Sequence, residues 1–525
     1  MNEMLTLKGA SDWATGYIGR YVSPSNISYL VQYGRIKKNG ANGSTRVSLQ
    51  DLLEYYNAYN GSRETSFKER LGNDINWELS FEQYKETETT KHVHRLHPYK
   101  GKFIPQLVEY FLDEHTDRLK KDTYFKAGDI VLDPFSGSGT TLVQAAELGI
   151  HAIGIDVSSF NSFISNAKLA KYNLANVEQA IFDITGALRN FVADSNIQDF
   201  DEKLLKELNA FNNKYFPVPD YKYQVRNKLI DEQTYGAEKE SDFLSVFERL
   251  VYDYDIKLSQ KTNSTFLDKW YLQSVRDEIG FVFEQIQQVK DSSVRQILEL
   301  ILSRTIRSCR ATTHADLVTL LQPVITPYYC SKHGKICKPL FSILKWWETY
   351  SKDTVKRLQQ FSNLRTNTHQ CCLTGDSRNI DILAALRQVK PAFAELLEQQ
   401  KIAGIFSSPP YVGLIDYHEQ HAYAYDLFGF ERNDISEIGA LSNGQTKKAQ
   451  DSYVEGIFKV LANCKRYLVS DYDVFLVAND KYNLYPAIAD KAGMKIVADF
   501  KRPVLNRAEK DKVAYSETIF HLKDI

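Results

Sequence analysis

Short apolar runs alternate with segments of helical periodicity in two separate parts of the chain. In the first part, two apolar runs each end in an aspartate, Asp133 and Asp156, and a glycine-rich turn lies between them. The predicted elements are, in order, a strand Ile130–Leu132, a turn Pro134–Gly139, a helix Leu142–Leu148 and a strand His151–Ile155. A strand, a helix and a second strand in this order predict a βαβ unit of a parallel sheet.

The same alternation returns near residue 370 and continues to the C-terminal end. Strands are predicted at Gln370–Leu373, Gly404–Phe406, Val474–Val477, Lys495–Phe500 and Glu517–Leu522, and helices at Val454–Leu468 and Pro486–Ala492. Between the two parts, residues 184–364 have mostly helical periodicity, for example over Val294–Arg307. We therefore expect one α/β sheet that is interrupted by a large helical insertion.

The first sixty residues have a pattern of their own. Helices are predicted over Ala14–Tyr21, from Ser23-Pro24 to Gly34, and over Leu49–Tyr56, with a turn at Gly40–Gly43 before the last one. Proline fits the first turn of a helix, where its missing N–H does no harm. This pattern resembles a winged helix-turn-helix of the excisionase kind, and the alternative is a small packing domain without a DNA-binding role.

These patterns divide the chain into five segments. They are the N-terminal domain 1–60, a linker 61–90, the first part of the sheet domain 91–183, the helical insertion 184–364 and the second part of the sheet domain 365–525.

The composition is that of a globular protein with two or three structural units. The chain has 525 residues, of which 43% are hydrophobic and 25% are charged. Residues 1–11 lack the apolar core of a secretory signal, and no apolar run reaches the length of about 18 residues that a membrane span needs. We therefore expect a cytoplasmic protein that has no membrane partner.

The net charge of −1 conceals three basic stretches that contain no acidic residue. They hold Arg35, Lys37, Lys38 and Arg46; Lys91, Arg95, Lys100 and Lys102; and Arg304, Arg307 and Arg310 at helical spacing. A solvated surface explains any one of these stretches, whereas three together favour contact with DNA phosphates.

The turn DPFSGSGTT, Asp133–Thr141, is the first candidate for chemistry. Gly137 and Gly139 let the backbone pass close to a ligand, where a Cβ would collide. Asp156 ends the next strand, at a position from which a carboxylate can accept hydrogen bonds from a ribose diol. The pair predicts a nucleoside ligand; the alternative is a tight turn between a strand and a helix.

The second candidate is SSPPY, Ser407–Tyr411, directly after the strand Gly404–Phe406. Pro409 and Pro410 fix the backbone and remove two N–H donors, so the carbonyl oxygens project rigidly. A planar base would stack on Tyr411 while its amino group points at Ser408 and the Pro409 carbonyl. The alternative is a rigid turn with a buried tyrosine.

DPFSGSGTT followed by SSPPY resembles the amino-methyltransferases of DNA, which methylate adenine N6 or cytosine N4. The resemblance implies a class I methyltransferase fold, Rossmann-like, with a mostly parallel seven-stranded sheet, and S-adenosylmethionine as the cofactor. It also implies a cofactor site formed by Tyr99, Phe103, Pro105, Asp133, Phe135, Gly137, Gly139, Thr140, Asp156 and Asp376, in which Tyr99, Phe103 and Pro105 belong to the segment His97–Pro105. The catalytic residues that it implies are Ser408, Pro409, Pro410 and Tyr411.

The resemblance also implies the partners and the cellular setting. The substrate is double-stranded DNA, in a restriction-modification or phage-defence system of a prokaryote or phage, with a separate cognate restriction endonuclease as a further partner. The insertion is a candidate target-recognition region. Because the target atom lies inside the duplex, the base must be flipped out.

Serine at the head of the catalytic motif favours cytosine N4, because adenine enzymes more often carry aspartate or asparagine there. Adenine N6 is the alternative.

The absence of a Pro-Cys nucleophile motif argues against C5 methylation, and Cys371 and Cys372 are expected in the core of a strand. A different class of explanation is a DNA-binding regulator with an inactive methyltransferase domain, but its glycines, Asp156 and Ser408 would not need to be intact. Two further alternatives are a fused nuclease and a methyltransferase that acts on a protein amide. The nuclease lacks a convincing P-D…(D/E)-x-K arrangement. The protein-amide enzymes share an N-P-P-Y motif, but they lack this long insertion and the N-terminal DNA-binding pattern.

The six cysteines are too few for a disulfide framework in a chain of this length. Cys330, His333 and Cys337, with Cys309 upstream, have a spacing that zinc ligands tolerate. Because a second C-x-x-C pair is missing, the sequence favours a basic loop with reduced thiols over a structural zinc site.

Overall fold

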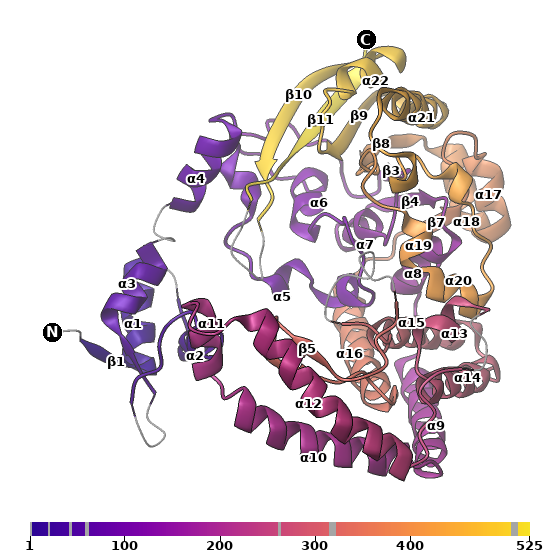
Figure 1. The fold of residues 1–525 in the computed structure, drawn as a ribbon. Coiled ribbons are helices and arrows are strands. Elements are labelled where there is room, and N and C mark those ends of the chain that lie inside the picture. The colour runs from indigo at the N-terminus through magenta and orange to yellow at the C-terminus, as the bar shows by residue number, and fades with distance from the viewer. Residues whose placement is uncertain are drawn as a thin grey trace.

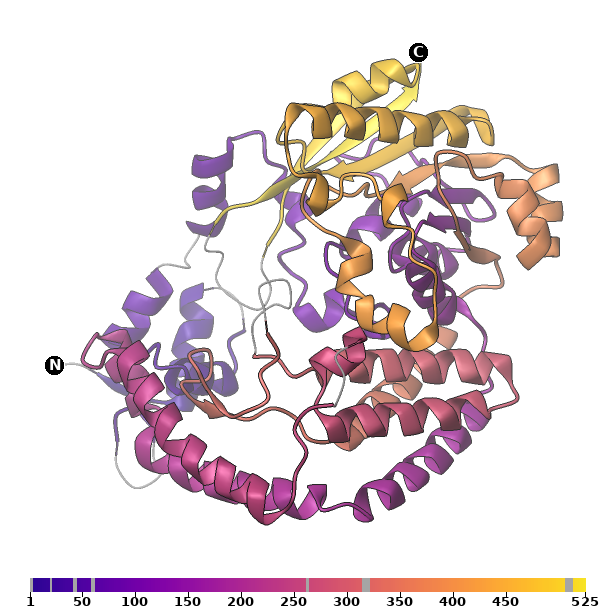
Figure 2. The same ribbon diagram turned by 45° about the vertical axis from the view of Figure 1, so that its right-hand side comes forward.

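The computed structural model describes residues 3–18, 21–40, 45–57, 62–260, 264–313, 322–505 and 513–525. A twisted sheet with helices on both faces forms one end of the molecule. A long helical insertion reaches from it to a small N-terminal domain (Figures 1 and 2).

The central sheet has seven strands in the order β10-β11-β9-β8-β3-β4-β7. The strands are β3 Ile130–Asp133, β4 His151–Asp156, β7 Gln370–Thr374, β8 Ile402–Ser407, β9 Leu468–Ala478, β10 Met494–Pro503 and β11 Ser516–Asp524. Neighbours from β9 to β7 pair in parallel, and β11 pairs antiparallel with both β9 and β10. The predicted mostly parallel, seven-stranded sheet is confirmed.

Side chains of the central strands alternate between two separate cores. Val131 and Ala152 pack against one group of helices, whereas Leu132 and Ile153 pack against the other. The first group is α6 Pro105–Leu112, α7 Thr140–Glu147 and α8 Ser159–Leu169; the second is α17 Ile382–Val389, α18 Pro391–Gln399, α21 Lys447–Lys465 and α22 Tyr485–Lys491. Burial on both faces explains why these strands read as continuous apolar runs.

Several predicted elements differ from the observed ones at their ends. The helix expected at Val454–Leu468 is α21, which begins at Lys447 because the Thr446 side chain caps it by accepting the Ala449 N–H. Leu468 already belongs to β9, whose first half carries exposed polar residues that do not show a strand pattern.

The insertion is mostly helical, as predicted. Its helices are α9 Leu174–Ala193, α10 Ile197–Tyr215, α11 Asp220–Arg226, α12 Glu232–Asp253, α13 Phe266–Trp270, α14 Gln273–Gln287, α15 Ser292–Ser308 and α16 Leu344–Ser362. The segment boundary expected at 183/184 was misplaced, because α9 runs through it with a continuous buried stripe from Val177 to Val192. A two-stranded hairpin, β5 Tyr328–Cys330 and β6 Lys335–Cys337, was not predicted, since strands of three residues are too short to show a period.

The N-terminal domain contains β1 Met4–Thr6, α1 Leu7–Ile18, α2 Pro24–Gln32, β2 Arg46–Ser48 and α3 Leu49–Asn57, and it has its own apolar core. Ser23 caps α2 by accepting the Asn26 N–H, with Pro24 in the first turn, as the sequence indicated. The helix expected from Ala14 begins at Leu7 instead, directly after β1. Of the predicted turn Gly40–Gly43, only Gly40 lies within the described residues.

The segment expected as a linker, residues 61–90, is not a free connection where the structure describes it. It forms α4 Ser62–Leu71, a 3-10 helix Trp77–Ser80 and α5 Glu86–Thr89. The Asn76 N–H donates to the Lys501 carbonyl at 2.8 Å, and Arg502 Nε donates to the Leu79 carbonyl at 3.1 Å. Because Leu79 is buried in the core of the sheet domain, this segment belongs to that domain.

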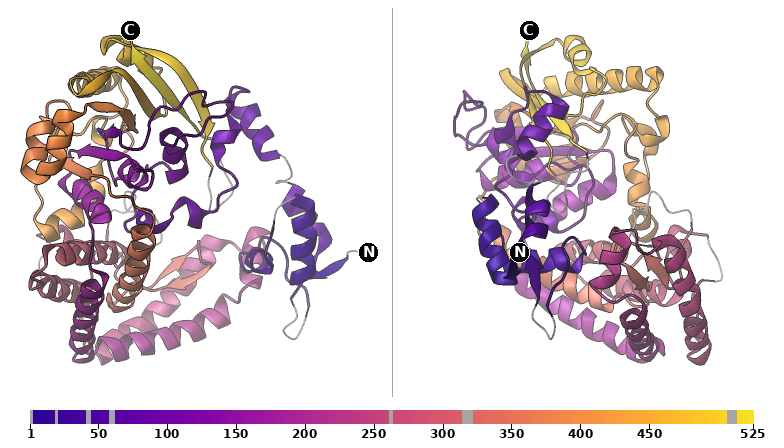
Figure 3. Two further views of the ribbon diagram at one scale, coloured as in Figure 1. Left: turned by 180° about the vertical axis from the view of Figure 1, so that it is seen from behind. Right: turned by 60° about the vertical axis from the view of Figure 1, so that its left-hand side comes forward.

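The N-terminal domain rests on the far end of the insertion (Figure 3). The Lys222 ammonium on α11 lies 4.4 Å from the ring centre of Tyr33, and the Lys37 ammonium lies 5.6 Å from that of Tyr223. Two reciprocal cation–π contacts therefore join the domain to α11.

Candidate active site

The two motif loops meet at the carboxyl edge of the sheet, where β3 and β8 are neighbours. Ser407 Oγ, at the end of β8, donates to Asp133 Oδ1, at the end of β3, at 2.5 Å. Burial raises the pKa of Asp133 to about 6, although its hydrogen bonds with Ser407, Thr141 and the Phe135 N–H work in the opposite direction. Residues 274 positions apart in the sequence are thus joined by a buried polar contact.

The glycine-rich turn follows β3 and requires its glycines. Gly137 and Gly139 have φ values of 50° and 76°. A Cβ at Gly137 would lie 2.9 Å from the Tyr99 hydroxyl, and one at Gly139 would lie 2.9 Å from Ser165 Oγ. The buried Lys168 fixes the turn from α8 by donating to the Ser138 carbonyl at 2.6 Å.

Asp156 occupies the end of β4 and faces the turn. Its carboxylate accepts hydrogen bonds from the Gly137 N–H at 2.8 Å, the Ser158 N–H at 2.9 Å and Asn161 Nδ2 at 3.0 Å. Burial raises its pKa to about 6, against the effect of these hydrogen bonds. Asp156 therefore holds the turn in shape and still reaches the space above the sheet.

A cleft of about 580 Å³, counting the part that opens to solvent, lies between the two loops. This volume is in the usual range for small-molecule sites. Six residues that the sequence pointed to line it, namely Tyr99, Phe135, Asp156, Asp376, Ser408 and Pro410. The other lining residues were missed, namely Pro134, Val157, Asn161, Ser377, Tyr417, Ser436, Glu437 and Ile438.

Some of the missed residues carried a signal in the sequence. Asn161 follows Asp156 by five positions, in the helix that begins after β4, and its proximity to the motif could have identified it. Tyr417 begins a helix of four residues and Glu437 directly follows a short 3-10 helix, and elements this short show no period in the sequence that would mark them.

The polar groups of the cleft fit S-adenosylmethionine. Asn161 Oδ1 is buried and has no hydrogen-bond partner among the described residues. The carboxylates of Asp156 and Glu437 lie in the same lining, and a ligand with a positive sulfonium and a ribose diol would satisfy them.

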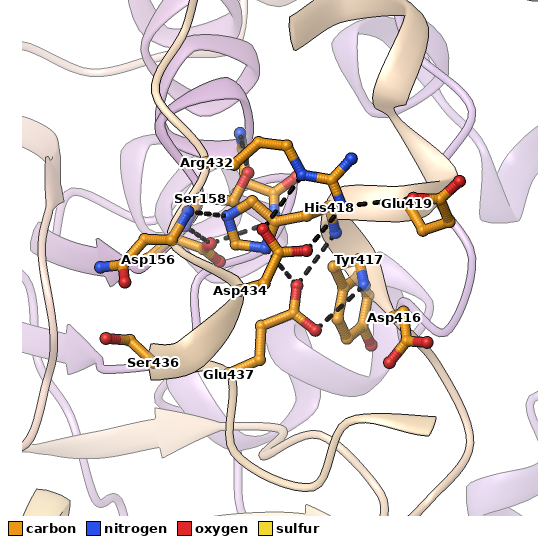
Figure 4. Close-up of polar contacts among 12 residues, drawn as sticks. Asp156, Ser158, Asp416, Tyr417, His418, Glu419, Arg432, Asp434, Ser436 and Glu437 are labelled. Atoms are coloured by element: carbon orange, nitrogen blue, oxygen red, sulfur yellow. Dashed lines mark hydrogen bonds and ion pairs between the residues drawn. The ribbon is translucent and has the colours of Figure 1, made fainter. Parts of the chain in front are cut away.

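The segment after SSPPY closes one side of the cleft (Figure 4). It contains α19 Tyr417–Gln420, α20 Ala422–Phe428 and a 3-10 helix Asp434–Ser436. The Glu437 carboxylate accepts the N–H groups of Tyr417 at 3.3 Å and His418 at 2.9 Å, and it also contacts His418 Nδ1. The Tyr417 ring stacks on Tyr99, with centroids 5.6 Å apart and planes at 15°.

Other predicted cofactor residues lie behind the cleft lining. Phe103 packs edge-on against Phe406, with centroids 5.6 Å apart, and Pro105 is the buried first residue of α6. Asp133, Gly137, Gly139 and the buried Thr140 shape the turn without lining the cleft.

Asp376 lines the cleft, but its carboxylate is already engaged. Arg378 donates to it through Nε at 2.9 Å and Nη2 at 2.6 Å. Burial opposes ionisation, but the hydrogen bonds and charge of Arg378 prevail and hold the pKa of Asp376 below its usual value. A ligand in the cleft would therefore meet the Asp376 carboxylate as one partner of an ion pair with Arg378.

The catalytic motif is divided between the cleft and the interior. Ser408 and Pro410 line the cleft, whereas Pro409 is buried beside them. The Tyr411 hydroxyl donates to Glu517 Oε1 at 2.7 Å, and Tyr411 does not line the cleft.

Two of the three basic stretches are partly internal, although Arg307 in the helical stretch is exposed. Arg304 pairs with Asp353 at 2.7 Å and Arg310 packs between the rings of Phe266 and Tyr423, so neither forms the DNA-binding surface that their spacing suggested. In the stretch Lys91–Lys102, Lys91 pairs with Glu147 and Lys102 donates to the His94 carbonyl, which leaves Arg95 and Lys100 exposed. Helical spacing cannot distinguish a basic surface from ion pairs made across helices.

The structure brings together three of the four candidate zinc ligands. Cys330, His333 and Cys337 form one cluster, but Cys309 is the buried C-cap of α15 and does not belong to it. Cys371 and Cys372 are buried in β7, as expected.

Comparison with known proteins places the chain among DNA methyltransferases. The profile of the N6/N4 methyltransferase family, described as DNA methylase, matches residues 29–165. The chain is 43% identical over 526 residues to the Type II methyltransferase M.MjaII of Methanocaldococcus jannaschii, and the alignment covers 99% of this chain and 97% of that protein.

Two further relatives have lower identity. The Type II methyltransferase M.MvaI of Kocuria varians is 28% identical over 157 residues, which cover 28% of this chain and 32% of that protein. The Type II methyltransferase M.BsoBI of Geobacillus stearothermophilus is 24% identical over 348 residues, which cover 66% and 54%. Among the described residues, no helix has the length and apolar character that a membrane crossing requires. The chain belongs to the N6/N4 family of S-adenosylmethionine-dependent DNA methyltransferases of restriction-modification type.

Proposed function

We propose that the chain methylates the exocyclic N4 of cytosine at a specific DNA sequence, with the target base flipped out of the duplex. The observation that carries this proposal is the position of Ser408. It heads the catalytic motif and lines the same cleft as Phe135 and Asp156. A hydrogen-bond acceptor for the base therefore lies beside the groups that would hold the methyl donor.

The chain's own residues would act mainly by positioning. An exocyclic amine is a poor nucleophile, because its lone pair is delocalised into the ring. Hydrogen bonds from the amine to Ser408 Oγ and the Pro409 carbonyl would favour a tetrahedral nitrogen and aim its lone pair at the methyl donor. No covalent bond between enzyme and base is needed.

The residues that would hold S-adenosylmethionine are Tyr99, Phe135, Asp156 and Asn161. When bound, the cofactor supplies an electrophilic methyl group on a sulfonium. Ionised Asp156 would accept from the ribose diol, and the unpartnered Asn161 Oδ1 would gain a donor. Glu437 adds negative charge to the lining near the positive sulfonium.

Tyr411 is proposed to stack on the flipped base. Its hydroxyl is tied to Glu517, and Arg502 in turn donates to Glu517 at 2.9 Å. These contacts would orient the partly buried ring beside Ser408, in position to stack on the captured base.

DNA binding would involve the N-terminal domain. Lys37, Lys38 and Arg46 are exposed on one side of it, next to the helix pair α1 and α2. Phosphate contacts from these side chains would position the duplex, while the insertion is a candidate for reading bases. We also propose, as a partner, a separate restriction endonuclease that recognises the same DNA sequence.

Adenine N6 is the second candidate, since the family includes both activities. To separate the two, DNA from cells that express the protein would be digested to nucleosides and analysed by mass spectrometry. N4-methylcytosine would support the proposal, and N6-methyladenine would replace it. Finding neither in DNA that the protein demonstrably binds would favour a regulator with an inactive domain.

A further inference from the structure

We propose that the chain binds one zinc ion at the tip of the β5–β6 hairpin, through Cys330, His333 and Cys337. The site is at least 70 positions away in the sequence from either motif loop, and the methylation proposal does not depend on it. The three ligand atoms all lie within 4.8 Å of one another.

The geometry matches a metal centre. Cys330 Sγ and Cys337 Sγ lie 3.6 Å and 3.3 Å from the same atom, His333 Nδ1. In a tetrahedron with a Zn–S bond of about 2.3 Å and a Zn–N bond of about 2.1 Å, the S···N separation is about 3.6 Å. A neutral imidazole nitrogen can accept a hydrogen from only one thiol. A cation shared by all three atoms satisfies both sulfurs and the nitrogen at once, at the separations observed.

The hairpin turn creates this arrangement. The N–H groups of His333 and Gly334 both donate to the Cys330 carbonyl, at 3.1 Å and 2.6 Å, which folds the His333 ring back over the first strand. Gly334 takes a φ of 62°, and β6 then returns the chain to Cys337. This single turn therefore brings the three side chains of the proposed site together.

The hairpin is held against neighbouring helices, whereas its two cysteines form a cluster of their own. Asn212 on α10 exchanges two hydrogen bonds with the Ile336 backbone, at 2.9 Å and 3.0 Å, and the Tyr329 N–H donates to Glu240 on α12 at 2.7 Å. Cys330 and Cys337 form a small apolar cluster with Tyr328 and Val324 that is separate from the main core. A metal ion would join the two strands at this cluster.

The chemistry of the ligands selects zinc. Two thiolates and an imidazole suit a borderline-soft cation, and two thiolates neutralise a divalent charge. The fourth tetrahedral position is left for water.

A second group of potential metal ligands consists of His92, His94 and Glu147, but its side chains already have protein partners. Lys91 already pairs with Glu147 at 2.7 Å, and His94 Nε2 is hydrogen-bonded to Gln144 at 2.9 Å. Protein partners therefore already engage this group, and we propose no metal ion there.

The metal would support the contact with the N-terminal domain. Lys222 Nζ donates to the Lys332 carbonyl in the hairpin turn at 3.0 Å and lies over the ring of Tyr33. Loss of the ion should therefore loosen the hairpin, α11 and α2, but leave the cleft unchanged.

The test measures metal content in the full-length chain, purified without added metal. We expect about one zinc per chain in the wild type and in Cys309→Ala, and less than about 0.2 in Cys337→Ala. Cys309 is the matched control, because it is a buried cysteine outside the cluster. Cobalt substitution should give thiolate-to-metal charge transfer and the d–d bands of a tetrahedral site. Cys337→His, which keeps a ligand, should retain zinc.

Hydrogen exchange distinguishes a metal site from a mere packing role for Cys337. Chelation of the wild type should speed exchange in β5, β6 and α2, with no change in β3 and α7. Three results would overturn the proposal: a wild type with less than about 0.2 zinc per chain, equal zinc in Cys337→Ala and Cys309→Ala, or a Cys330–Cys337 disulfide in the purified protein.

Discussion

The sheet edge and the helical insertion are held together in different ways. At the sheet edge, buried polar contacts fix the loops: Ser407 with Asp133, Gly137 with Asp156, and Lys168 with the Ser138 carbonyl. In the insertion, α9, α14 and α15 associate through apolar stripes, and their polar residues mostly face outward. Desolvated charges are costly, and a chain retains them where they position chemistry. The buried polar contacts at the sheet edge therefore support the proposed chemistry there, whereas DNA contact by the insertion and the N-terminal domain is a proposal that the experiments below test.

Removal of Ser408 Oγ should have the largest effect. Ser408→Ala deletes one acceptor for the amine but leaves the Pro409 carbonyl, so single-turnover methyl transfer should slow by about 10² to 10³. Cofactor and DNA affinities should stay the same, since the Ser408 side chain makes no hydrogen bond to the described residues that would shape the cleft. Ser470→Ala, at an exposed serine on β9, is the matched control and should react at the wild-type rate.

A side chain at Gly137 should weaken cofactor binding. Gly137→Val places a β-branched residue at a φ of 50° and a Cβ 2.9 Å from the Tyr99 hydroxyl. The turn must shift to relieve this, and we expect calorimetry to show affinity for S-adenosylmethionine reduced by about ten- to a hundredfold. Gly186→Val, where a Cβ meets nothing within 4 Å, should bind normally. Equal affinity of both variants for S-adenosylmethionine would show that the turn is not part of the cofactor site.

The pH dependence of cofactor binding should report Asp156. The ionised carboxylate accepts from both ribose hydroxyls, whereas protonation replaces one acceptor by an O–H donor, and burial raises the pKa of Asp156 to about 6. Protonation leaves about a tenth of the group ionised at pH 5, so affinity should fall about tenfold between pH 7 and pH 5. Asp156→Asn should bind weakly at both values, with a flat profile. A steep profile in that variant would assign the titration to Asp133 instead.

Charge removal in the N-terminal domain should have the smallest effect. Lys38→Ala combined with Arg46→Ala removes two exposed cations and should lower the salt slope of DNA binding by about 2, with an affinity loss of a few-fold at physiological salt. The same double change at Lys447 and Lys448, on α21, should leave the slope unaltered. A normal slope in the first variant would make the N-terminal domain a packing element only.

The sequence could predict those residues of the site that belong to rigid motif loops, but not those that tertiary packing brings to the cleft. Gly137, Asp156 and Ser408 were identifiable because rigid turns and buried acceptors need particular residue types at particular spacings. Tyr417 and Glu437 were not, because short elements reach the cleft through tertiary packing that leaves no period in the sequence. The ion pair of Arg304 with Asp353 was missed for a related reason, since its partner is 49 positions away on another helix.

The most direct test of the account is the identity of the atom that receives the methyl group. DNA labelled uniformly with ¹⁵N would be methylated with S-adenosylmethionine carrying a ¹³C methyl group, digested and analysed by nuclear magnetic resonance. The account predicts a methyl carbon with one-bond coupling to nitrogen, in a cytosine nucleoside. A methyl carbon bonded to C5 of cytosine would contradict the mechanism, and one bonded to N6 of adenine would contradict the assignment of the base.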